Sequence, residues 1–309
     1  MIQRIGYQRE LDDSTRIINA FRRRRFRKHG QFAEDEIILP NGPFVNQRFR
    51  LSTQPFARIL YDEIDSGMYS EIIVTGPSQT GKTLIAWVIP LLHMLFEKCE
   101  TCIAAVPDYD MVMDKWEQDI EPVLRLTRYW RYMPAMGRGS KGGRTAKITF
   151  KHGPELRWMT AGGGDKARAA YTARSVFMTE TDGFDTQAST STETSKIGQI
   201  EARQRAWKRH QRFTIKEGTL TTKTAHTWSR YCAGTCSVLH LPCPHCGEFG
   251  PLNRKDLHGW QSATTDAEAE ERSLFHCGAC GESWTETERA DANQRAVLVH
   301  KGQSVVKGK

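Results

Sequence analysis

The octapeptide Gly76-Pro77-Ser78-Gln79-Thr80-Gly81-Lys82-Thr83 decides the fold of this 309-residue chain. It matches G-x-x-x-x-G-K-[ST] at every fixed position, the pattern of a loop that wraps phosphate groups. The two glycines let the backbone curl so that successive N–H groups point inward, and the following helix adds its positive end. Lys82 is expected to neutralise the β- and γ-phosphates, and the Thr83 hydroxyl to ligate Mg²⁺. All eight residues are therefore predicted to hold ATP.

The regions on both sides of this loop read as strands alternating with helices. Short, apolar, β-branched runs predict buried strands, and longer apolar or amphipathic runs predict helices. The expected strands are 71–75, 101–106, 175–178 and 213–215, with a hairpin over 148–150 and 156–159, and the expected helices are 84–97, 110–124 and 197–212. This alternation predicts an α/β P-loop NTPase fold with a mostly parallel sheet flanked by helices on both faces.

An NTPase also needs acidic groups at the end of a neighbouring strand, and the stretch Val176-Phe177-Met178-Thr179-Glu180-Thr181-Asp182 offers them. Glu180 is expected to orient the attacking water. Thr179 occupies the position where an aspartate would hold the water shell of Mg²⁺, so Thr179 itself or Asp182 is the candidate for that side of the metal. The alternative is that Glu180 and Asp182 merely open a polar turn.

A basic stretch between the loop and this strand offers arginines for the transferring phosphoryl group. Motor ATPases often use an arginine, from the same or a neighbouring subunit, to stabilise the charge that develops there. The candidates are Arg138, Arg144 and Arg168, and the sequence does not choose between them. For any single one of them, a solvated loop charge is the alternative.

Two cysteine motifs near the C-terminus predict a metal site. Cys243-Pro244-His245-Cys246-Gly247 and Cys277-Gly278-Ala279-Cys280-Gly281 are C-x-x-C-G knuckles. Four thiolates in a tetrahedral array suit structural Zn²⁺ and leave no open coordination position. We therefore predict a small C-terminal zinc ribbon held by Cys243, Cys246, Cys277 and Cys280, with an iron–sulfur cluster as the alternative.

Composition narrows the class of protein further. The net charge is +8, and residues 1–50 hold 11 basic against 6 acidic side chains, which favours a polyanionic partner such as nucleic acid. A merely basic, well-solvated surface is the alternative. No apolar run is long enough to span a membrane and no secretory signal is visible, so we expect a cytoplasmic protein. The expected division is a basic N-terminal segment over 1–50, a P-loop ATPase core over 51–235, and the zinc ribbon with a C-terminal tail over 236–309.

In this order, the phosphate loop, the Thr-Glu-x-Asp strand end and the C-P-x-C-G ribbon resemble the lambda-type large terminase subunits of tailed bacteriophages. Gln54-Pro55-Phe56 is similar to the family's segment near the adenine, which implies that Gln54 contacts the base. Glu217-Gly218-Thr219-Leu220 resembles its coupling motif, usually a Ser/Thr pair. Gly218 departs from that pair, so the resemblance leaves Thr219 alone to sense the γ-phosphate.

The resemblance implies a viral DNA-packaging motor that hydrolyses ATP to translocate double-stranded DNA into a procapsid. It implies a homo-oligomeric ring at the portal protein, and a small terminase subunit that selects the DNA. Large terminases also carry a C-terminal nuclease domain, for which the residues between the ribbon and Lys309 leave no room, so no nuclease activity is expected of these residues. Whether the chain is a truncated portion or a natural short form stays open.

Two other functions fit the same motifs. A zinc-ribbon helicase or remodelling ATPase would be stimulated by single strands or forks and would unwind them. A catalytically weak nucleotide- and DNA-binding assembly module is suggested by Thr179, because a hydroxyl is a poorer partner for Mg²⁺ than a carboxylate.

Overall fold

The fold is centred on one seven-stranded sheet. The computed structural model describes residues 25–137, 142–162, 171–184 and 195–305. Within them, the strand order of the large sheet is β1-β7-β6-β2-β5-β4-β3, and the first five strands run parallel. Its strands are β1 (Glu71–Thr75), β2 (Cys102–Val106), β3 (Gly143–Arg144), β4 (Lys147–Thr149), β5 (Glu155–Thr160), β6 (Ser175–Thr179) and β7 (Phe213–Gly218). The expected α/β fold with a mostly parallel sheet is confirmed.

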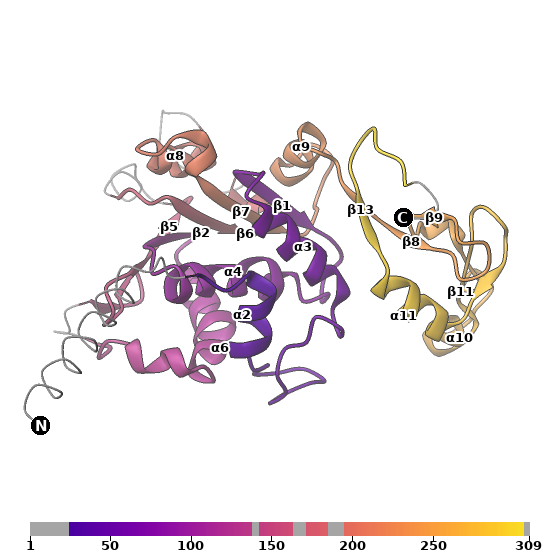
Figure 1. Cartoon of the computed structure of the whole chain (residues 1–309), viewed down its shortest axis with the longest axis horizontal. Coiled ribbons are helices and arrows are strands. Elements are labelled where there is room, and N and C mark those ends of the chain that lie inside the picture. Colours follow the sequence, from indigo (N-terminus) through magenta and orange to yellow (C-terminus); the bar gives the residue numbers. More distant parts are fainter. Residues whose placement is uncertain (1–24, 138–141, 163–170, 185–194, 306–309) are drawn as a thin grey trace, which may run out of the picture.

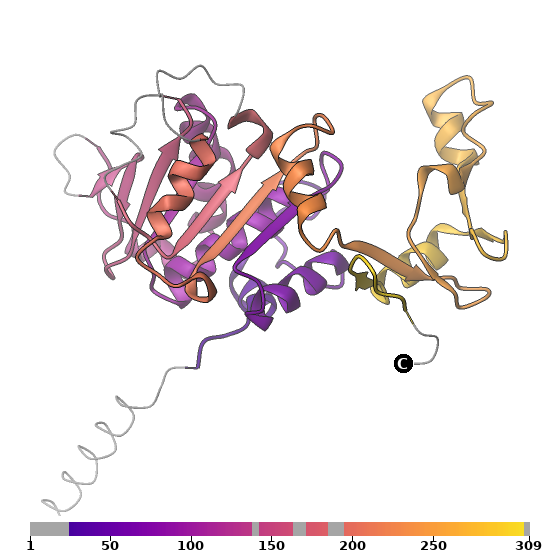
Figure 2. The same cartoon turned by 90° about the horizontal axis from the view of Figure 1, so that it is seen from above.

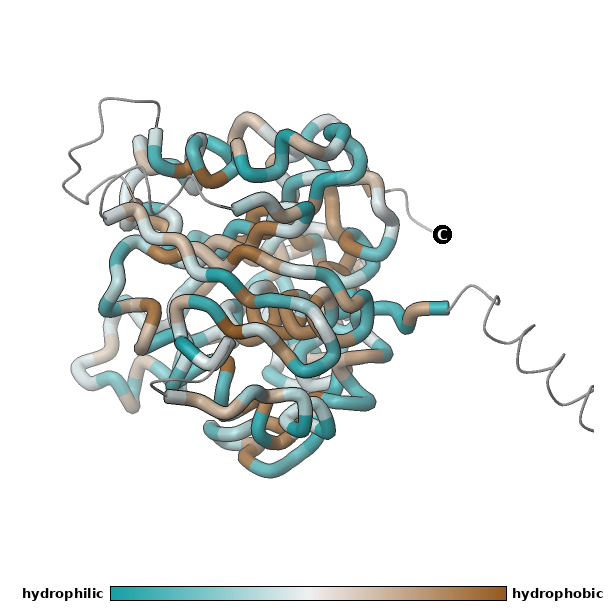
Figure 3. The backbone as a smooth tube through the Cα atoms, turned by 90° about the vertical axis from the view of Figure 1, so that its left-hand side faces the viewer, coloured by the Kyte–Doolittle hydropathy of each residue, from teal (hydrophilic) through white to brown (hydrophobic). Residues whose placement is uncertain are grey.

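The two faces of the sheet are both buried, which is why its strands are apolar on both sides. In β2, Cys102, Ala104 and Val106 face one apolar cluster, and Ile103 and Ala105 face the other. This alternation follows from the two-residue period of a strand. Figure 1 shows helices below and above the sheet accordingly, and the apolar residues gather along the middle of the chain trace in Figure 3.

The larger cluster lies under the face that carries most of the helices. The helix after the phosphate loop continues through Pro90, with a π-helical turn on each side of a short α-helical piece. The elements of this layer are α2 (His29–Glu36), α3 (Pro55–Ser66), η1 (Thr83–Val88), α4 (Ile89–Leu92), η2 (His93–Glu97), α5 (Asp110–Asp114), η3 (Lys115–Ile120), α6 (Glu121–Arg125) and η4 (Arg128–Tyr132). The helices expected over 84–97 and 110–124 are confirmed, as composites of α- and π-helical turns.

The opposite face is covered by fewer and shorter helices. They are η5 (Thr181–Phe184), α8 (Lys196–Glu201), η6 (Ala202–Gln204), η7 (Arg209–Gln211) and α9 (His226–Ala233). The expectation of one helix over 197–212 was wrong. The side chain of Gln204 donates to the backbone oxygens of Arg174 and Phe213, and Thr214 donates to Gln204 in turn. These bonds tie the segment to the neighbouring strands, so it continues as irregular turns rather than as a helix.

The residues just before the expected boundary at 51 pack into the core beside the large sheet. Phe32, Ile37 and Phe49 are fully or almost fully buried in the larger cluster. The guanidinium of Arg27 contacts the carboxylates of Glu36 and Glu97 at 2.6 and 2.8 Å. The core therefore extends N-terminal to the expected boundary, and Arg27 joins it through this ionic cluster.

The C-terminal part forms a separate lobe beside the sheet (Figure 2). It consists of β8 (Val238–Pro242), β9 (Phe249–Gly250), η8 (Arg254–Asp256), β10 (Leu257–His258), α10 (Asp266–Arg272), β11 (Leu274–His276), β12 (Ser283–Trp284), α11 (Glu286–Gln294) and β13 (Val297–Val299). It holds two three-stranded antiparallel sheets, β13-β8-β9 and β10-β11-β12. A small cluster around Trp284 and Leu241 joins the lobe to Ile59 of α3. Among the described residues, no helix is long and apolar enough to cross a membrane.

Candidate nucleotide and metal sites

The phosphate loop joins the end of β1 to the start of η1 and has the curled backbone that its glycines predicted. Gly81 has φ +78°, and Gln79 adopts φ +58°, a conformation that costs a non-glycine residue roughly 1 kcal/mol. The Lys82 side chain folds back over the loop. Its Nζ donates to the backbone oxygen of Pro77 at 2.9 Å and to the Thr219 hydroxyl at 3.1 Å. The ammonium group therefore lies at the centre of the loop, where phosphate oxygens would replace these two acceptors.

Thr219 and Glu180 come from adjacent strands and line the same cavity. Thr219 follows the end of β7, and Glu180 follows the end of β6. Both line a cavity of about 480 Å³, and Thr219 links this cavity to the phosphate loop through its bond to Lys82. Glu180 has φ +52°, so its backbone is held in a conformation that is strained for any L residue. The structure thus brings together the residue expected to orient water and the residue expected to sense the γ-phosphate.

Gly218 has a steric reason to depart from the Ser/Thr pair of the coupling motif. A Cβ atom at this position would lie 3.3 Å from the backbone nitrogen of Thr181, tighter than most real contacts. The chain therefore passes close to the turn after β6 at this point. A glycine keeps Thr219 within reach of Lys82.

Asp182 lines the same cavity, but its carboxylate is hydrogen-bonded to the segment that follows β7. One oxygen accepts from the backbone N–H and the hydroxyl of Thr221, and the other accepts from the backbone N–H of Thr227. Partial burial opposes ionisation, but these bonds outweigh it and hold the pKa of Asp182 below its ordinary value. The contacts fit an anchor for the segment that carries Thr219 rather than a partner of the metal.

Thr179 and Thr83 both contact a carboxylate that the sequence did not single out. Glu217 lies on β7, between β1 and β6, and its side chain is 1% exposed. One of its oxygens accepts from the Thr179 hydroxyl at 2.7 Å, and the other lies 3.5 Å from the Thr83 hydroxyl. Its only sequence signal was its place in the segment that resembles the coupling motif. Its burial beside the phosphate loop depends on the strand order.

A second and larger cavity, of about 1170 Å³, is lined in part by Lys82. The lining includes Gln54, Gly76, Pro77 and Thr80 of the expected nucleotide site, with Phe56 nearby. The far wall is formed by the C-terminal lobe and includes Leu298 and His300. Phosphates lying at Lys82 would place the attached nucleoside in this space, where an apolar side chain and an amide are available to a base.

The three candidate arginines lie away from the loop or outside the described residues. Arg144 is exposed on β3, the sheet edge opposite to β1. Six strand spacings of about 4.8 Å put it roughly 29 Å from β1, so it could serve only a neighbouring subunit's nucleotide. Arg138 and Arg168 lie outside the described residues.

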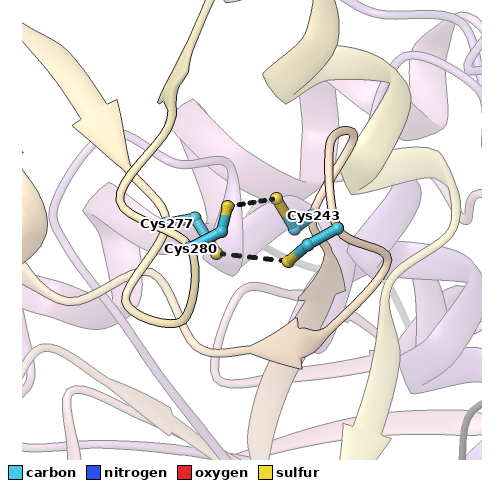
Figure 4. A group of neighbouring side chains, drawn as sticks. Cys243, Cys277 and Cys280 are labelled. Atoms are coloured by element: carbon cyan, nitrogen blue, oxygen red, sulfur yellow. Dashed lines mark hydrogen bonds between the residues drawn. The ribbon is translucent and has the colours of Figure 1, made fainter.

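The four cysteines of the two knuckles converge at the C-terminal lobe (Figure 4). Their sulfur atoms all lie within 4.8 Å of one another, with Cys243 and Cys280 3.9 Å apart and Cys246 and Cys277 3.8 Å apart. Zn–S bonds of about 2.3 Å in a tetrahedron require sulfur–sulfur separations of about 3.8 Å. The donor set and these two separations therefore fit Zn²⁺. The histidines beside them donate to backbone oxygens instead, His245 to that of Ser283 and His276 to that of Gly281.

Comparison with known proteins places this arrangement among viral ATPases. The family model described as phage terminase large subunit gpA, ATPase domain, matches residues 45–297. The crystal structure of the large terminase of bacteriophage HK97 superposes with a TM-score of 0.51 at 15% sequence identity, over 69% of this chain and 42% of that one. A large terminase ATPase domain variant of Thermus phage P74-26 gives 0.39 at 13% identity, over 63% and 75%. No curated protein matches the chain. The chain thus corresponds to less than half the length of the HK97 protein.

Proposed function

Since the chain belongs to the family of ATPase domains of the phage terminase large subunit gpA, we propose that it drives viral DNA packaging. In this proposal the chain hydrolyses ATP and uses the energy to move double-stranded DNA into a procapsid. The observation that carries it is that Thr219 bonds to Lys82 of the phosphate loop and also lines one cavity with Glu180.

The geometry supports a division of labour among these residues. Lys82 would exchange its bonds to Pro77 and Thr219 for bonds to phosphate oxygens, which are stronger acceptors because they are charged. Glu180 would accept a hydrogen bond from the attacking water in the adjoining cavity. Mg²⁺, when bound at Thr83, would supply neutralisation of the phosphate charge.

Release of Thr219 links the occupied loop to the rest of the motor. When Lys82 turns to the phosphates, Thr219 loses its donor and its hydroxyl is free to bond the γ-phosphate. Asp182 holds the following residues, so a shift of Thr219 would pull on the start of α9 through Thr221 and Thr227. This is a path by which phosphate loss could move a helix against the sheet.

The larger assembly is part of the same proposal. Subunits would form a homo-oligomeric ring at the portal protein in the host cytoplasm, and a small terminase subunit would present the DNA. The contact with DNA would be directed at the phosphate backbone, because a translocating motor cannot depend on base sequence. In a ring, Arg138, Arg144 or Arg168 of one subunit would reach the ATP of the next.

We also propose that the lobe over 236–309 is a zinc ribbon and that the ATPase core precedes it, with the N-terminal division near residue 51 moved toward residue 29. The cysteine spacing supports the first part, and the burial of Phe32 and Phe49 supports the second.

The proposal is tested by steady-state ATP hydrolysis of the purified chain, alone and with linear duplex DNA. We expect duplex DNA to stimulate turnover and forked or single-stranded DNA to stimulate it less, with no strand separation. Lys82→Ala should abolish the signal, and Lys208→Ala, an exposed lysine outside the site, should leave it unchanged. Unwinding of a fork would instead favour a helicase, and ATP binding without turnover under every condition would favour an assembly module.

A further inference from the structure

The strand β7 places the buried carboxylate of Glu217 beside Thr179, where β6 itself carries no acid. In the parallel register, Glu217 is the direct neighbour of Thr179 on β6 and of Val74 on β1. Paired residues on adjacent strands project their side chains to the same face of a sheet. Glu217 therefore reaches the same point as a side chain at position 179 would, one strand closer to the phosphate loop.

The surroundings of Glu217 leave its charge without a partner. Its side chain is 1% exposed, and in the described part of the chain no lysine, arginine or histidine lies within ion-pair distance of it. Lys82 and Lys115 attract this charge only from farther away. A buried carboxylate is stable only when it is neutral or paired with a cation.

Both polar neighbours of this carboxylate belong to the expected metal side of the site. The Thr83 hydroxyl is the group that a phosphate loop offers to Mg²⁺, and it lies 3.5 Å from one Glu217 oxygen. The Thr179 hydroxyl, at the position normally taken by an aspartate, donates to the other oxygen and so fixes the carboxylate's orientation. Carboxylate and hydroxyl oxygens are the donors that Mg²⁺ prefers.

We propose that Glu217 supplies the carboxylate that holds Mg²⁺ beside Thr83, replacing the aspartate that position 179 lacks. The inference rests on the proposed ATPase function. The acidic partner of the metal has thus moved from β6 to β7, and Thr179 acts as a positioning residue through its bond to Glu217. Glu180 is then left for the attacking water alone.

The test measures how Mg²⁺ changes nucleotide affinity, so it does not depend on turnover. A fluorescent ATP analogue is titrated into the full chain with Mg²⁺ and again with EDTA, and Mn²⁺ binding to the nucleotide complex is followed by EPR. We expect Glu217→Gln to weaken metal binding by roughly 10- to 100-fold, as loss of a group that holds or orients a metal does. Its affinity for the analogue in EDTA should equal that of the wild type.

Moving the carboxylate back separates a metal role from a structural one. In the double variant Thr179→Asp, Glu217→Gln the acid returns to β6, and Mg²⁺-dependent affinity should recover most of the loss. Glu270→Gln, an exposed change in the C-terminal lobe, is the matched control. Circular dichroism and thermal melting show whether each variant is folded. If Glu217→Gln is not folded, Glu217→Asp, which keeps the charge but shortens the side chain, is measured in its place.

The outcomes distinguish this inference from the function on which it rests. A wild type that gains affinity from Mg²⁺ while Glu217→Gln gains as much would overturn the inference alone. A double variant as defective as the single one would also overturn it, because the defect would then be structural. A wild type that binds no ATP analogue with or without Mg²⁺ would overturn both.

Discussion

The Nζ atom of Lys82 and the hydroxyl of Thr219 lie 3.1 Å apart, although 137 positions separate them in the chain. This bond joins the loop after β1 to the segment after β7. It exists only because β7 lies next to β1 in the sheet. In the proposed function, Lys82 would therefore both bind phosphate and lose its bond to Thr219 when phosphate is present.

Replacing Lys82 with alanine is expected to remove the principal positive charge in the phosphate loop. The rate of ATP hydrolysis should fall by roughly 100-fold or more, because a preorganised charge at the phosphoryl group stabilises the transition state. ATP affinity should fall as well. Both are measured by a coupled phosphate-release assay and by analogue titration. Hydrolysis at the wild-type rate would mean that the loop is not the site of cleavage.

Glu180→Gln should separate chemistry from binding. The amide keeps the size of the side chain but accepts protons poorly, so turnover should drop by roughly 10²- to 10⁴-fold. Affinity for the ATP analogue should stay at the wild-type value, because Lys82 and the loop are intact. Glu117→Gln, an exposed change on η3, is the control. Equal losses of affinity and turnover would instead assign Glu180 to ATP binding.

The purified chain should carry one zinc ion, and Cys277→Ser should lose it. Structural zinc binding is worth about 10–16 kcal/mol in small metal-folded domains, so the C-terminal lobe should open when the ion leaves. Metal analysis gives the zinc content, and hydrogen exchange over residues 238–299 reports the opening. Cys232→Ser removes an exposed thiol outside the quartet and should retain the ion. Iron in place of zinc would favour a cluster.

The free energy of unfolding should decrease as the pH falls below about 6.5. Burial is the main cause that lowers the pKa of His93 to about 3, with His29 adding to it, whereas the bond to the Arg27 backbone oxygen and Asp65 oppose it. Below about pH 6.5 the imidazole of His93 takes up a proton in the unfolded chain but stays neutral in the folded chain. The free energy of unfolding therefore falls by up to about 1.4 kcal/mol per pH unit.

Urea unfolding at pH 7 and pH 5 measures this effect. His93→Phe removes the titrating group and should shrink the difference between the two pH values, whatever it does to stability itself. His210→Gln, at an exposed position, should leave the difference unchanged. A pH dependence that survives in His93→Phe would assign it to other groups.

The elements that local patterns specify strongly were predictable. The strand before the phosphate loop, the helix after it and the hairpin of β4 and β5 follow from runs of residues close in sequence. Each half of the cysteine quartet was also predictable from residues close in sequence, because each knuckle presents two thiolates from a five-residue turn. The helix α2 was not predicted. Its place in the core depends on contacts distant in sequence, the burial of Phe32 in the larger cluster and the bond of Arg27 to Glu97, 70 positions away.

The part of the site that escaped prediction depends on strand order. Periodicity indicates that β7 is a strand, but it does not say that β7 lies between β1 and β6. That placement buries Glu217 between Thr179 and Thr83. In our proposal, Glu217 on β7 then takes the role of the aspartate that is missing at position 179 on β6. It also brings Thr219 to Lys82. Long-range pairing of this kind leaves no periodic trace in a single sequence.

Helix α3 begins beside the large cavity, at the N-cap Gln54, and packs Ile59 against the cluster of the C-terminal lobe. A nucleoside bound in this cavity and a zinc ion bound in the lobe would share one thermodynamic cycle, and α3 is a physical path between the two places. If zinc in the lobe raises the affinity for the nucleoside by some factor, the nucleoside must raise the affinity for zinc by the same factor. The motor's energy source and its structural metal would then each act as an effector of the other.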